Sequence, residues 1–479
     1  MASHFAPISR EVPSGTPFND VRLVRRYDQL MSEMKRQRCS TLHRLGHSYS
    51  EGKAYYRFMA NKKVNVGELI GIDQEQIKQR LNGRHILAIG DTTEISLKQQ
   101  ISHIQDANRV GRLSDNKTPG FLCHAQLFMD ANSGHGLGLG SILLWNRKLR
   151  SAKAPKPSLP YEQRESYKWE CLIRESLPMT DQAQTTTHVF DQEADIFDLF
   201  KGVNEIEKGQ HHLIVRSHYN RSVEEQDQEV KLWDVMNRTA FEYSYELKLG
   251  AQNRPNRSRR KKQNRKRRQA RIQLRYGSIQ LLAPSTQPKG TPSQTFFWVE
   301  ALEQADSVPA GEAPIHWRLL TTHSLSSAEE AMQIIRWYEK RWMIEQLFRL
   351  IKRKGFNIEG CQLQYLDAIL KMTVMTLKAA FDVLRLLLAR DNEQAQPITE
   401  VFHEDQIKCL YLINEKLQGN TEKQQNRHPP EQLSWATWVV ARLGGWKGLS
   451  SQGLPGPITI KRGLEQFQTY YEAWKLFKS

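Results

Sequence analysis

Three carboxylates that lie far apart in the chain could together hold divalent cations. Asp91 closes the apolar run 85–90, Asp191 closes the run 186–190, and Glu345 lies in a segment with helical periodicity. Acids at the ends of adjacent strands can converge in space, and hard divalent cations prefer converging carboxylate oxygens. Two such ions about 3.5–4 Å apart can stabilise both the attacking and the leaving oxygen of a phosphodiester. The three acids therefore predict a metal-dependent enzyme that acts on nucleic acid, provided that they meet.

Glu345 shares one predicted helix face with an aromatic residue and two cations. The positions of Tyr338, Arg341, Glu345 and Lys352 differ by 3, 4 and 7 residues in turn. At about 100° per residue, this spacing places them in a stripe roughly 60° wide. A surface ladder of ion pairs is the alternative for such a stripe. Because arginine and lysine both bind phosphate oxygens and here surround a single acid, we favour a site for phosphate and metal.

A longer motif around Glu345 resembles the Y-R-E-K signature of the DDE transposases of the bacterial insertion-sequence-four group. It reads Tyr338-x-x-Arg341-Trp342-x-Ile344-Glu345-x-x-Phe348-x-x-x-Lys352. Asp91 and Asp191 resemble the first and second catalytic acids of that family, and Glu345 resembles the third. Further matches follow in order along nearly the whole chain, at 54–58, 215–217 and 441–445. One departure is Gln192, where relatives often carry arginine, and this puts one phosphate contact in doubt but no metal ligand.

The resemblance implies an α/β fold with an RNase-H-like catalytic core, an all-β insertion, and helical domains on both sides. Asp91, Asp191 and Glu345 would hold two Mg²⁺ ions per active site, and Mn²⁺ could substitute. The implied reactions are hydrolysis at transposon ends, hairpin formation by the freed 3′-OH, hairpin opening, and joining of the 3′-OH to target DNA. Each is an in-line phosphoryl transfer, so one metal pair can serve all of them. The implied partners are double-stranded DNA and a second copy of the chain in a homodimer.

The resemblance also assigns DNA contacts around the predicted site. Tyr338 and Arg341 would grip phosphate near the scissile bond, and Lys352 would hold the neighbouring backbone. Trp317 aligns with the tryptophan that receives or braces a flipped base in the family. Stacking of an aromatic side chain on an extruded base is worth about 1–3 kcal/mol. A buried tryptophan within a sheet is the alternative interpretation of Trp317.

Three arginines are expected as further DNA contacts. Arg216 lies in the match at 215–217, and Arg57 lies in the match at 54–58. Arg26 falls in a basic segment whose apolar residues recur at helical spacing. A helical N-terminal module that contacts the DNA end with Arg26 and Arg57 is one interpretation, and a charged helix facing solvent is the other.

The charge balance favours a polyanionic partner. The 69 Lys and Arg against 52 Asp and Glu give a net charge of +17, with a pI near 9.5, and neutralised phosphates release counterions. Twelve of the cations lie between Arg254 and Arg275 without an acid. A run this dense repels itself, which predicts a mobile loop that orders on a phosphate backbone. A basic but inert surface, with a solvated loop that has no partner, is the alternative.

The pattern of elements predicts three domains. Residues 1–80 read as a helical domain that binds DNA ends, and residues 366–479 as a helical dimerisation domain. Residues 81–365 read as the catalytic core, in which short strands alternate with helices and 121–145 forms a hairpin. Four strands between about 225 and 325 predict the β insertion.

Several features set limits on the class of protein. The most apolar stretch, 366–388, carries five charged residues and predicts a buried helix instead of a membrane span. The five cysteines are scattered, which predicts neither a zinc site nor a disulfide framework. The glycine-rich stretch 134–140 lacks the Gly-Lys-Ser/Thr of a phosphate-binding loop. With no apolar signal segment at the start, we expect a soluble, cytoplasmic, nucleoid-associated bacterial protein with no membrane partner.

Two other functions fit the same residues. An RNase-H-like DNA nuclease would cut DNA with Mg²⁺ but would yield no insertions. A catalytically inactive regulator would bind DNA ends, and its binding would survive Asp91→Ala.

Overall fold

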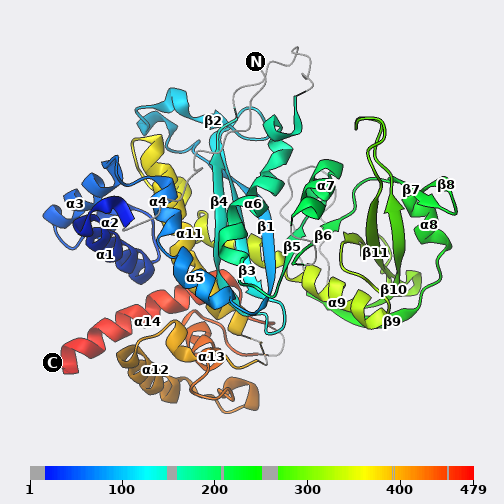
Figure 1. The fold of residues 1–479 in the computed structure, drawn as a ribbon. Helices are drawn as coiled ribbons and strands as arrows, with labels where there is room; N and C mark the ends of the chain where they lie inside the picture. Colours follow the sequence, from blue (N-terminus) through cyan, green and yellow to red (C-terminus); the bar gives the residue numbers. More distant parts are fainter. Residues whose placement is uncertain are drawn as a thin grey trace. The chain divides into compact units, whose positions relative to one another are not determined.

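The computed structural model describes residues 17–147, 159–206, 210–250, 268–390, 392, 394–449 and 452–478. Contacts divide the chain into two units (Figure 1). Unit 1 comprises Met1–Gln184 and Trp342–Ser479, and unit 2 comprises Thr185–Arg341. Each unit combines a sheet with helices, so the prediction of a mixed α/β fold is confirmed. The three predicted domain boundaries stay predictions.

Among the described residues, unit 1 contains four strands and most of the helices. Its strands are β1 (His85–Ser96), β2 (Gly111–Arg112), β3 (Pro119–Asp130) and β4 (Gly136–Trp145). Its helices before unit 2 are α1 (Val21–Gln37), α2 (Leu42–Leu45), α3 (Tyr49–Ala60), α4 (Val66–Gly71), α5 (Gln74–Leu81) and α6 (Lys168–Thr180). Its helices after unit 2 are α10 (Trp342–Ile351), α11 (Leu366–Ala389), α12 (Glu404–Leu417), α13 (Leu433–Leu443) and α14 (Pro457–Lys478).

The strands of unit 1 form an antiparallel sheet around β3. Strand β3 pairs with β1 along one edge and with β4 and β2 along the other. The predicted hairpin is therefore confirmed as β3 and β4. The glycines of β4 serve packing, because a Cβ on Gly138 would lie 2.8 Å from Cγ1 of Ile77 on α5. Helices α5, α6 and α11 all pack against β4 (Figure 1).

The helices predicted between residues 18 and 80 are confirmed as α1–α5. Helix α1 begins at Asp20, whose side chain accepts a hydrogen bond from the backbone N–H of Arg22. This N-cap satisfies a donor that the first turn leaves without a partner. Tyr27, Leu30 and Met34 are buried on one face of α1, as the helical spacing predicts.

Two lysines of the buried helix α11 fix the ends of N-terminal helices. The Lys371 Nζ donates to the carbonyl oxygens of Met59 and Asn61, 2.9 and 3.0 Å away, at the end of α3. The Lys378 Nζ donates to the carbonyl oxygen of Ile70 at 3.3 Å and pairs with Asp73. Burial lowers the pKa of both lysines, and their partners make that burial tolerable. These contacts explain two of the five charges that interrupt the most apolar stretch of the sequence.

Unit 2 is built around a mixed sheet. Its strands are β5 (Thr185–Phe190), β6 (His211–Arg216), β7 (Ser222–Glu225), β8 (Gln228–Lys231), β9 (Tyr243–Leu249), β10 (Arg268–Leu281), β11 (Gln294–Glu303) and β12 (His316–Thr321). The order is β5-β6-β12-β11-β10-β7-β8, with β9 also paired to β10. Its helices are α7 (Phe197–Glu205), α8 (Leu232–Arg238) and α9 (Ala328–Glu339). The four strands predicted between 225 and 325 are confirmed as β9–β12, but α8 also lies there, so this region is not purely β.

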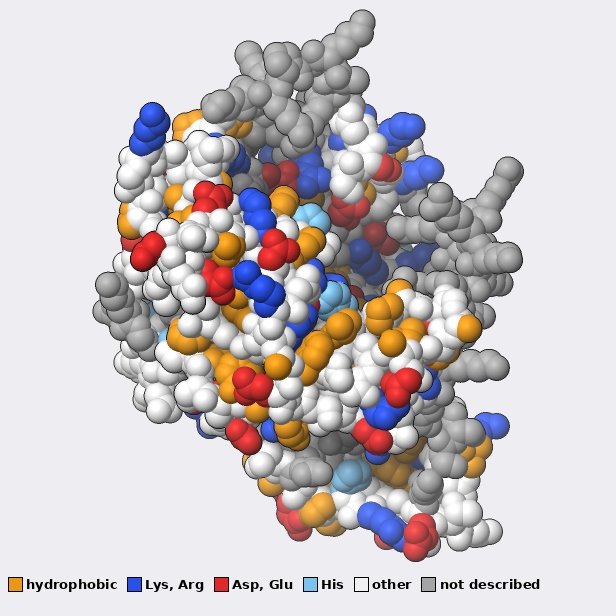
Figure 2. All heavy atoms as spheres, turned by 90° about the vertical axis from the view of Figure 1, so that its right-hand side faces the viewer, with side chains coloured by type: hydrophobic (Ala, Val, Ile, Leu, Met, Phe, Trp, Pro, Cys, Tyr) orange, Lys and Arg blue, Asp and Glu red, His pale blue; other side chains and the backbone are white. Residues whose placement is uncertain are grey.

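Part of the basic segment is a strand, which corrects the prediction of a loop over its whole length. Residues 251–267 lie outside the described residues, but Arg268, Arg271 and Arg275 belong to β10. The three arginines pair with acids on or just after β11: Glu303, Asp306 and Glu300, respectively. The acids that the segment itself lacks are thus supplied by the neighbouring strand. On the face that Figure 2 turns to the viewer, acidic and basic side chains are interspersed.

Glu300 lies at the centre of a buried cluster of charges in unit 2. Its side chain is fully buried and pairs with Arg275, Arg318 and His316. Burial by itself would raise the pKa of Glu300, but the hydrogen bonds from these partners lower the pKa to about 2. Glu300 is therefore held as a carboxylate, and its partners satisfy the charge where water cannot.

No helix in the described part of the chain is both long enough and apolar enough to cross a membrane. All five cysteines are among the described residues, and each of them is a free thiol.

Candidate active site

Asp91 lies in the middle of β1, not at the end of a strand as the sequence predicted. The strand continues to Ser96 because β1 pairs with β3 as far as Ser96 opposite Gly120. The Asp91 Oδ1 accepts a hydrogen bond of 2.7 Å from the N–H of Thr92. Its side chain is partly exposed, whereas Ile86–Gly90 behind it are buried. The strand thus holds one carboxylate at the surface of unit 1.

Glu345 does not share one continuous helix with Tyr338, which corrects the predicted stripe. Helix α9 ends at Glu339, and α10 begins at Trp342. Between them, the N–H of Arg341 bonds to the carbonyl of Tyr338, three residues earlier, at 3.0 Å. The break has a packing cause, because α9 packs on β10 and β11 of unit 2, whereas α10 packs on β1 and α11 of unit 1. Lys352 lies one residue beyond α10.

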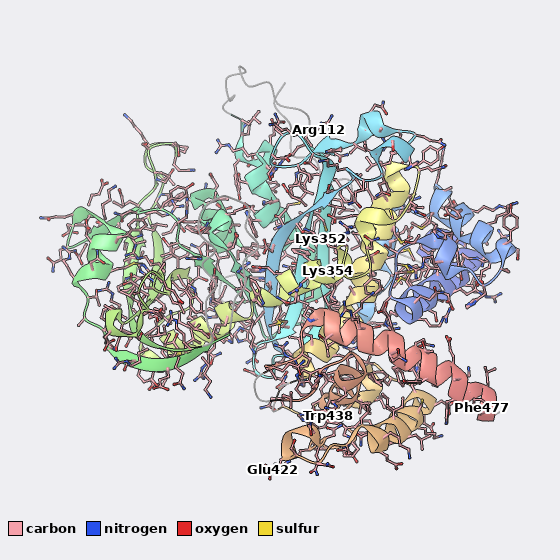
Figure 3. All side chains as sticks on the ribbon, turned by 180° about the vertical axis from the view of Figure 1, so that it is seen from behind. Arg112, Lys352, Lys354, Glu422, Trp438 and Phe477 are labelled. Atoms are coloured by element: carbon pink, nitrogen blue, oxygen red, sulfur yellow. The ribbon has the colours of Figure 1, made fainter. Side chains whose placement is uncertain are left out.

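Asp91 and Glu345 nevertheless line the same pocket of unit 1. The pocket has a volume of about 520 Å³. It is lined by Asp91, Thr92, Thr93, Glu345, Phe348, Arg349, Lys352, Arg353, Lys354 and Glu359. Lys352 and Lys354 leave the end of α10 beside the strands of unit 1 (Figure 3). Carboxylates for a cation and several cations for phosphates therefore share one open pocket, which suits a phosphodiester substrate.

The basic edge of this pocket depends on a glycine. A Cβ on Gly355 would lie 1.5 Å from the carbonyl oxygen of Leu350, which already accepts the N–H of Phe356 at 2.7 Å. The chain can turn back here, directly after Lys352 and Lys354, only without a side chain.

We expect Gly355→Ala to lower the stability of the protein by about 1–3 kcal/mol, because the backbone must shift to relieve the clash. Thermal unfolding of the full chain measures this loss. Gly52→Ala is the matched control, since a Cβ on Gly52 of α3 meets nothing within 4 Å. An equal melting temperature for the two variants would contradict the expectation.

In unit 2, Asp191 and Arg216 lie at the carboxyl ends of neighbouring parallel strands, Asp191 directly after β5 and Arg216 as the last residue of β6. Phe190 and Val215 are register partners on β5 and β6, and Asp191 and Arg216 come directly after them. The Asp191 Oδ1 accepts the N–H of Glu193 at 2.9 Å. Since the carboxyl ends of parallel strands meet at one edge of a sheet, the position of Asp191 at a strand end is confirmed.

Tyr338 brings the other predicted residues of unit 2 together. Its side chain is buried and hydrogen-bonded to Arg341. Burial raises the pKa of Tyr338, the nearby charges of Arg341 and Arg216 oppose this rise, and the charge of Asp191 adds to it. The charges of Asp191, Arg216 and Arg341 therefore all lie near enough to Tyr338 to act on its pKa.

Trp317 belongs to the same group. It lies on β12, its ring centroid is 6.0 Å from that of Tyr338, and the two rings meet edge to face. The guanidinium of Arg216 donates to the carbonyl of His316 at 3.3 Å, next to Trp317. The tryptophan lies on a strand and is only partly buried, and its contact with a flipped base stays a prediction.

The N-terminal arginines lie on separate helices of unit 1. Arg26 of α1 places its guanidinium 5.8 Å from the ring centroid of Tyr55, and Arg57 of α3 is exposed. Their contacts with DNA remain a prediction.

Within the described residues, no three His, Cys, Asp or Glu side chains come together as metal ligands. Asp91 and Glu345 provide two hard oxygen donors at the pocket of unit 1, and this donor chemistry fits Mg²⁺ or Mn²⁺. Asp191 belongs to unit 2, and the convergence of all three acids stays a prediction.

Sequence reasoning missed part of the basic edge. Arg349, Arg353 and Lys354 line the pocket together with Lys352. Four cations within the six residues 349–354 indicate a basic edge, but only Lys352 belongs to the Y-R-E-K motif.

Residues 199–381 match the family model of the transposase DDE domain. The match supports a DDE transposase. It covers Glu345 together with Tyr338, Arg341 and Lys352, and it begins after Asp91 and Asp191. A DDE domain implies an RNase-H-like core, DDE transposases generally use divalent metals, and the substrate of a transposase is DNA.

Proposed function

We propose that this chain is a cut-and-paste transposase of the insertion-sequence-four group. One observation carries the proposal: Asp91 and Glu345 line a single pocket that is edged by Lys352 and Lys354. The Y-R-E-K motif and the match to the transposase DDE domain support the same function.

In this proposal, Asp91, Asp191 and Glu345 meet and hold two Mg²⁺ ions, for which Mn²⁺ can substitute. The bound ions supply the Lewis acidity that stabilises the attacking and leaving oxygens of an in-line displacement. The chain positions the DNA around them. Lys352 binds the backbone next to the scissile phosphate, and Arg341 and Tyr338 hold that phosphate.

The reaction then proceeds in four displacements at phosphorus. Water attacks the phosphate at the transposon end, and the bond to the 3′ oxygen breaks to leave a 3′-OH. This hydroxyl attacks a phosphate of the opposite strand, displaces the 3′ oxygen of the flanking DNA and closes a hairpin, which a second water opens. The released 3′-OH finally attacks a phosphate of target DNA and joins the element to it. Each displacement exchanges one oxygen on phosphorus for another, so the same groups serve every step.

Synapsis of two ends requires two copies of the chain, and we propose that α14 forms the homodimer surface. Tyr470, Leu476 and Phe477 are exposed on α14, whereas residues 433–441 of α13, which the sequence also suggested for this surface, are buried within the chain itself. Residues 1–80 would bind the end sequence through Arg26 and Arg57, residues 81–365 would form the catalytic core, and residues 366–479 would dimerise. The site of action would be the bacterial nucleoid.

The decisive experiment incubates the full chain with DNA that carries the ends of its own element, with and without Mg²⁺. Double-strand breaks with a hairpin intermediate, followed by insertions in a target plasmid, are expected only with Mg²⁺. Cleavage without insertions would favour a nuclease. Tight binding to the ends without metal-dependent products would favour an inactive regulator, and either result would overturn the proposal.

Trp317 gives a test of the hairpin step. Loss of base stacking worth about 1–3 kcal/mol corresponds to a loss of roughly 5- to 150-fold. Trp317→Ala should therefore slow hairpin formation by about that factor while the first nick proceeds, and Trp317→Phe should restore most of the rate. Strand-specific labels on denaturing gels separate the two steps. An equal loss at both steps would contradict a role in flipping a base.

A further inference from the structure

The loop after β6 presents an aromatic pair beside Arg216. His218 and Tyr219 are exposed, and 55% of the Tyr219 surface remains accessible. Their ring centroids lie 4.7 Å apart at an interplanar angle of 80°. Large aromatic side chains at the surface are common singly, but here two of them form one edge-to-face pair.

This pair is held in place by a buried carboxylate. The Asp195 Oδ2 accepts the backbone N–H groups of His218 at 2.6 Å and Tyr219 at 2.9 Å. Its other oxygen accepts the Nε of Arg221 at 2.7 Å, and the Asp195 side chain is fully buried. A buried charge with three donors is costly to rearrange. The exposed rings are therefore fixed at their backbone, unlike residues of an ordinary surface loop.

Arg221 secures the same loop from the other side. Its guanidinium lies 5.4 Å from the ring centroid of Tyr219 and 5.3 Å from that of Phe200. The N–H of Ser217 also bonds to the carbonyl of Arg318 on β12, at 2.8 Å. The loop is thereby joined to the strand that carries Trp317.

The aromatic pair lies close to Arg216, one of the predicted DNA contacts of unit 2. Tyr219 is three residues from Arg216, so their Cα atoms are at most about 11 Å apart. The guanidinium of Arg216 in turn donates to the carbonyl of His316, next to Trp317, whose ring meets that of Tyr338. Exposed aromatic rings beside cations are the surface that binds unpaired bases, because every base has a face for stacking.

We propose that His218 and Tyr219 form a stacking platform for one unpaired nucleotide of the DNA substrate, separate from the base assigned to Trp317. This inference rests on the proposed function for the presence of DNA at this edge of unit 2. A tight DNA hairpin leaves bases unpaired on both strands at its tip, so two aromatic sites serve it better than one. Asp195 and Arg221 act as positioning residues for the platform.

The test measures stacking directly and needs no cleavage. The full chain is mixed, in Ca²⁺, with a terminal duplex of its element that carries two unpaired nucleotides, one on each strand. The fluorescent base 2-aminopurine replaces each unpaired base in turn, and stacking on an aromatic ring quenches it. We expect the wild type to quench both positions. Tyr219→Ala should lose one of them, with a loss of affinity on the order of tenfold.

Three variants complete the experiment. Tyr219→Phe should retain the quenching, and Trp317→Ala should lose only the other position. Tyr243→Ala is the matched control, because Tyr243 is a similarly exposed tyrosine on β9 of the same unit. The proposal is overturned if Tyr219→Ala still quenches both positions or if Tyr243→Ala loses as much as Tyr219→Ala. If quenching follows Tyr219 but the ends are never cut with Mg²⁺, the platform stands and the proposed transposase function fails.

Discussion

Asp91→Asn should reduce cleavage at the element ends by about 1000-fold or more. The substitution keeps the shape of the side chain but removes the negative charge that a hard cation prefers. A metal ion contributes several kcal/mol of transition-state stabilisation, and each 1.36 kcal/mol is a factor of ten in rate. Glu345→Gln should have a similar effect, because Glu345 lines the same pocket. Timed cleavage assays with Mg²⁺ measure both losses.

Glu94→Gln provides the matched control for these variants. Glu94 lies on the same strand, β1, and accepts the N–H of Ser114 at 2.7 Å. Its position three residues from Asp91 places it on the opposite face of the sheet, and glutamine retains an accepting oxygen. Near-normal cleavage by Glu94→Gln, with unchanged DNA binding by all three variants, would attribute the losses to the two acids. Rapid cleavage by Asp91→Asn would remove the basis of the proposed chemistry.

Glu300→Ala should have the largest effect on stability. It would leave the buried Arg275 and the half-buried Arg318 without their shared carboxylate, and loss of one partner of a buried pair typically costs about 3–5 kcal/mol. Hydrogen exchange of β10 and β11 in the full chain reports the local free energy of unfolding. Glu225→Ala is the control, because the pair between Glu225 and Arg238 is exposed and should contribute less than about 1 kcal/mol.

The same carboxylate predicts a pH dependence. The folded state holds the pKa of Glu300 at about 2, below its ordinary value of 4.5. Its contribution to stability is therefore complete above pH 4.5 and is lost progressively as the pH falls towards 2. In Glu300→Gln this part of the acid sensitivity of β10 and β11 should disappear. An unchanged acid profile in that variant would show that other groups cause the transition.

Features with a local cause could be predicted from the sequence. The short run before Asp191 gave β5, and the turn residues after Asp130 gave the hairpin of β3 and β4, because alternation and turn chemistry are properties of neighbouring residues. The motif around Glu345 identified an acid that lines a pocket together with Asp91.

Features with a tertiary cause could not be predicted. The helical pattern of the sequence runs without interruption through the break between α9 and α10. The break arises because the two helices pack against different units. The extension of β1 beyond Asp91 depends on pairing with β3, and the order in Arg268–Arg275 depends on acids supplied by other strands. Partners far away in the sequence determine these three features, so the periodicity of a single segment cannot predict them.

Because the lysines of α11 are synthesised late, α3 and α4 can reach their final structure only late in translation. Lys371 follows Met59, whose carbonyl it holds, by 312 residues. At about 5–20 residues per second, a ribosome needs on the order of 15–60 s to cover that distance. For this interval the nascent α3 and α4 lack the donors that close their last turns in the finished protein. A truncated product that stops before residue 371 would never acquire them, so α3, which carries Arg57, gains its final support only late in translation.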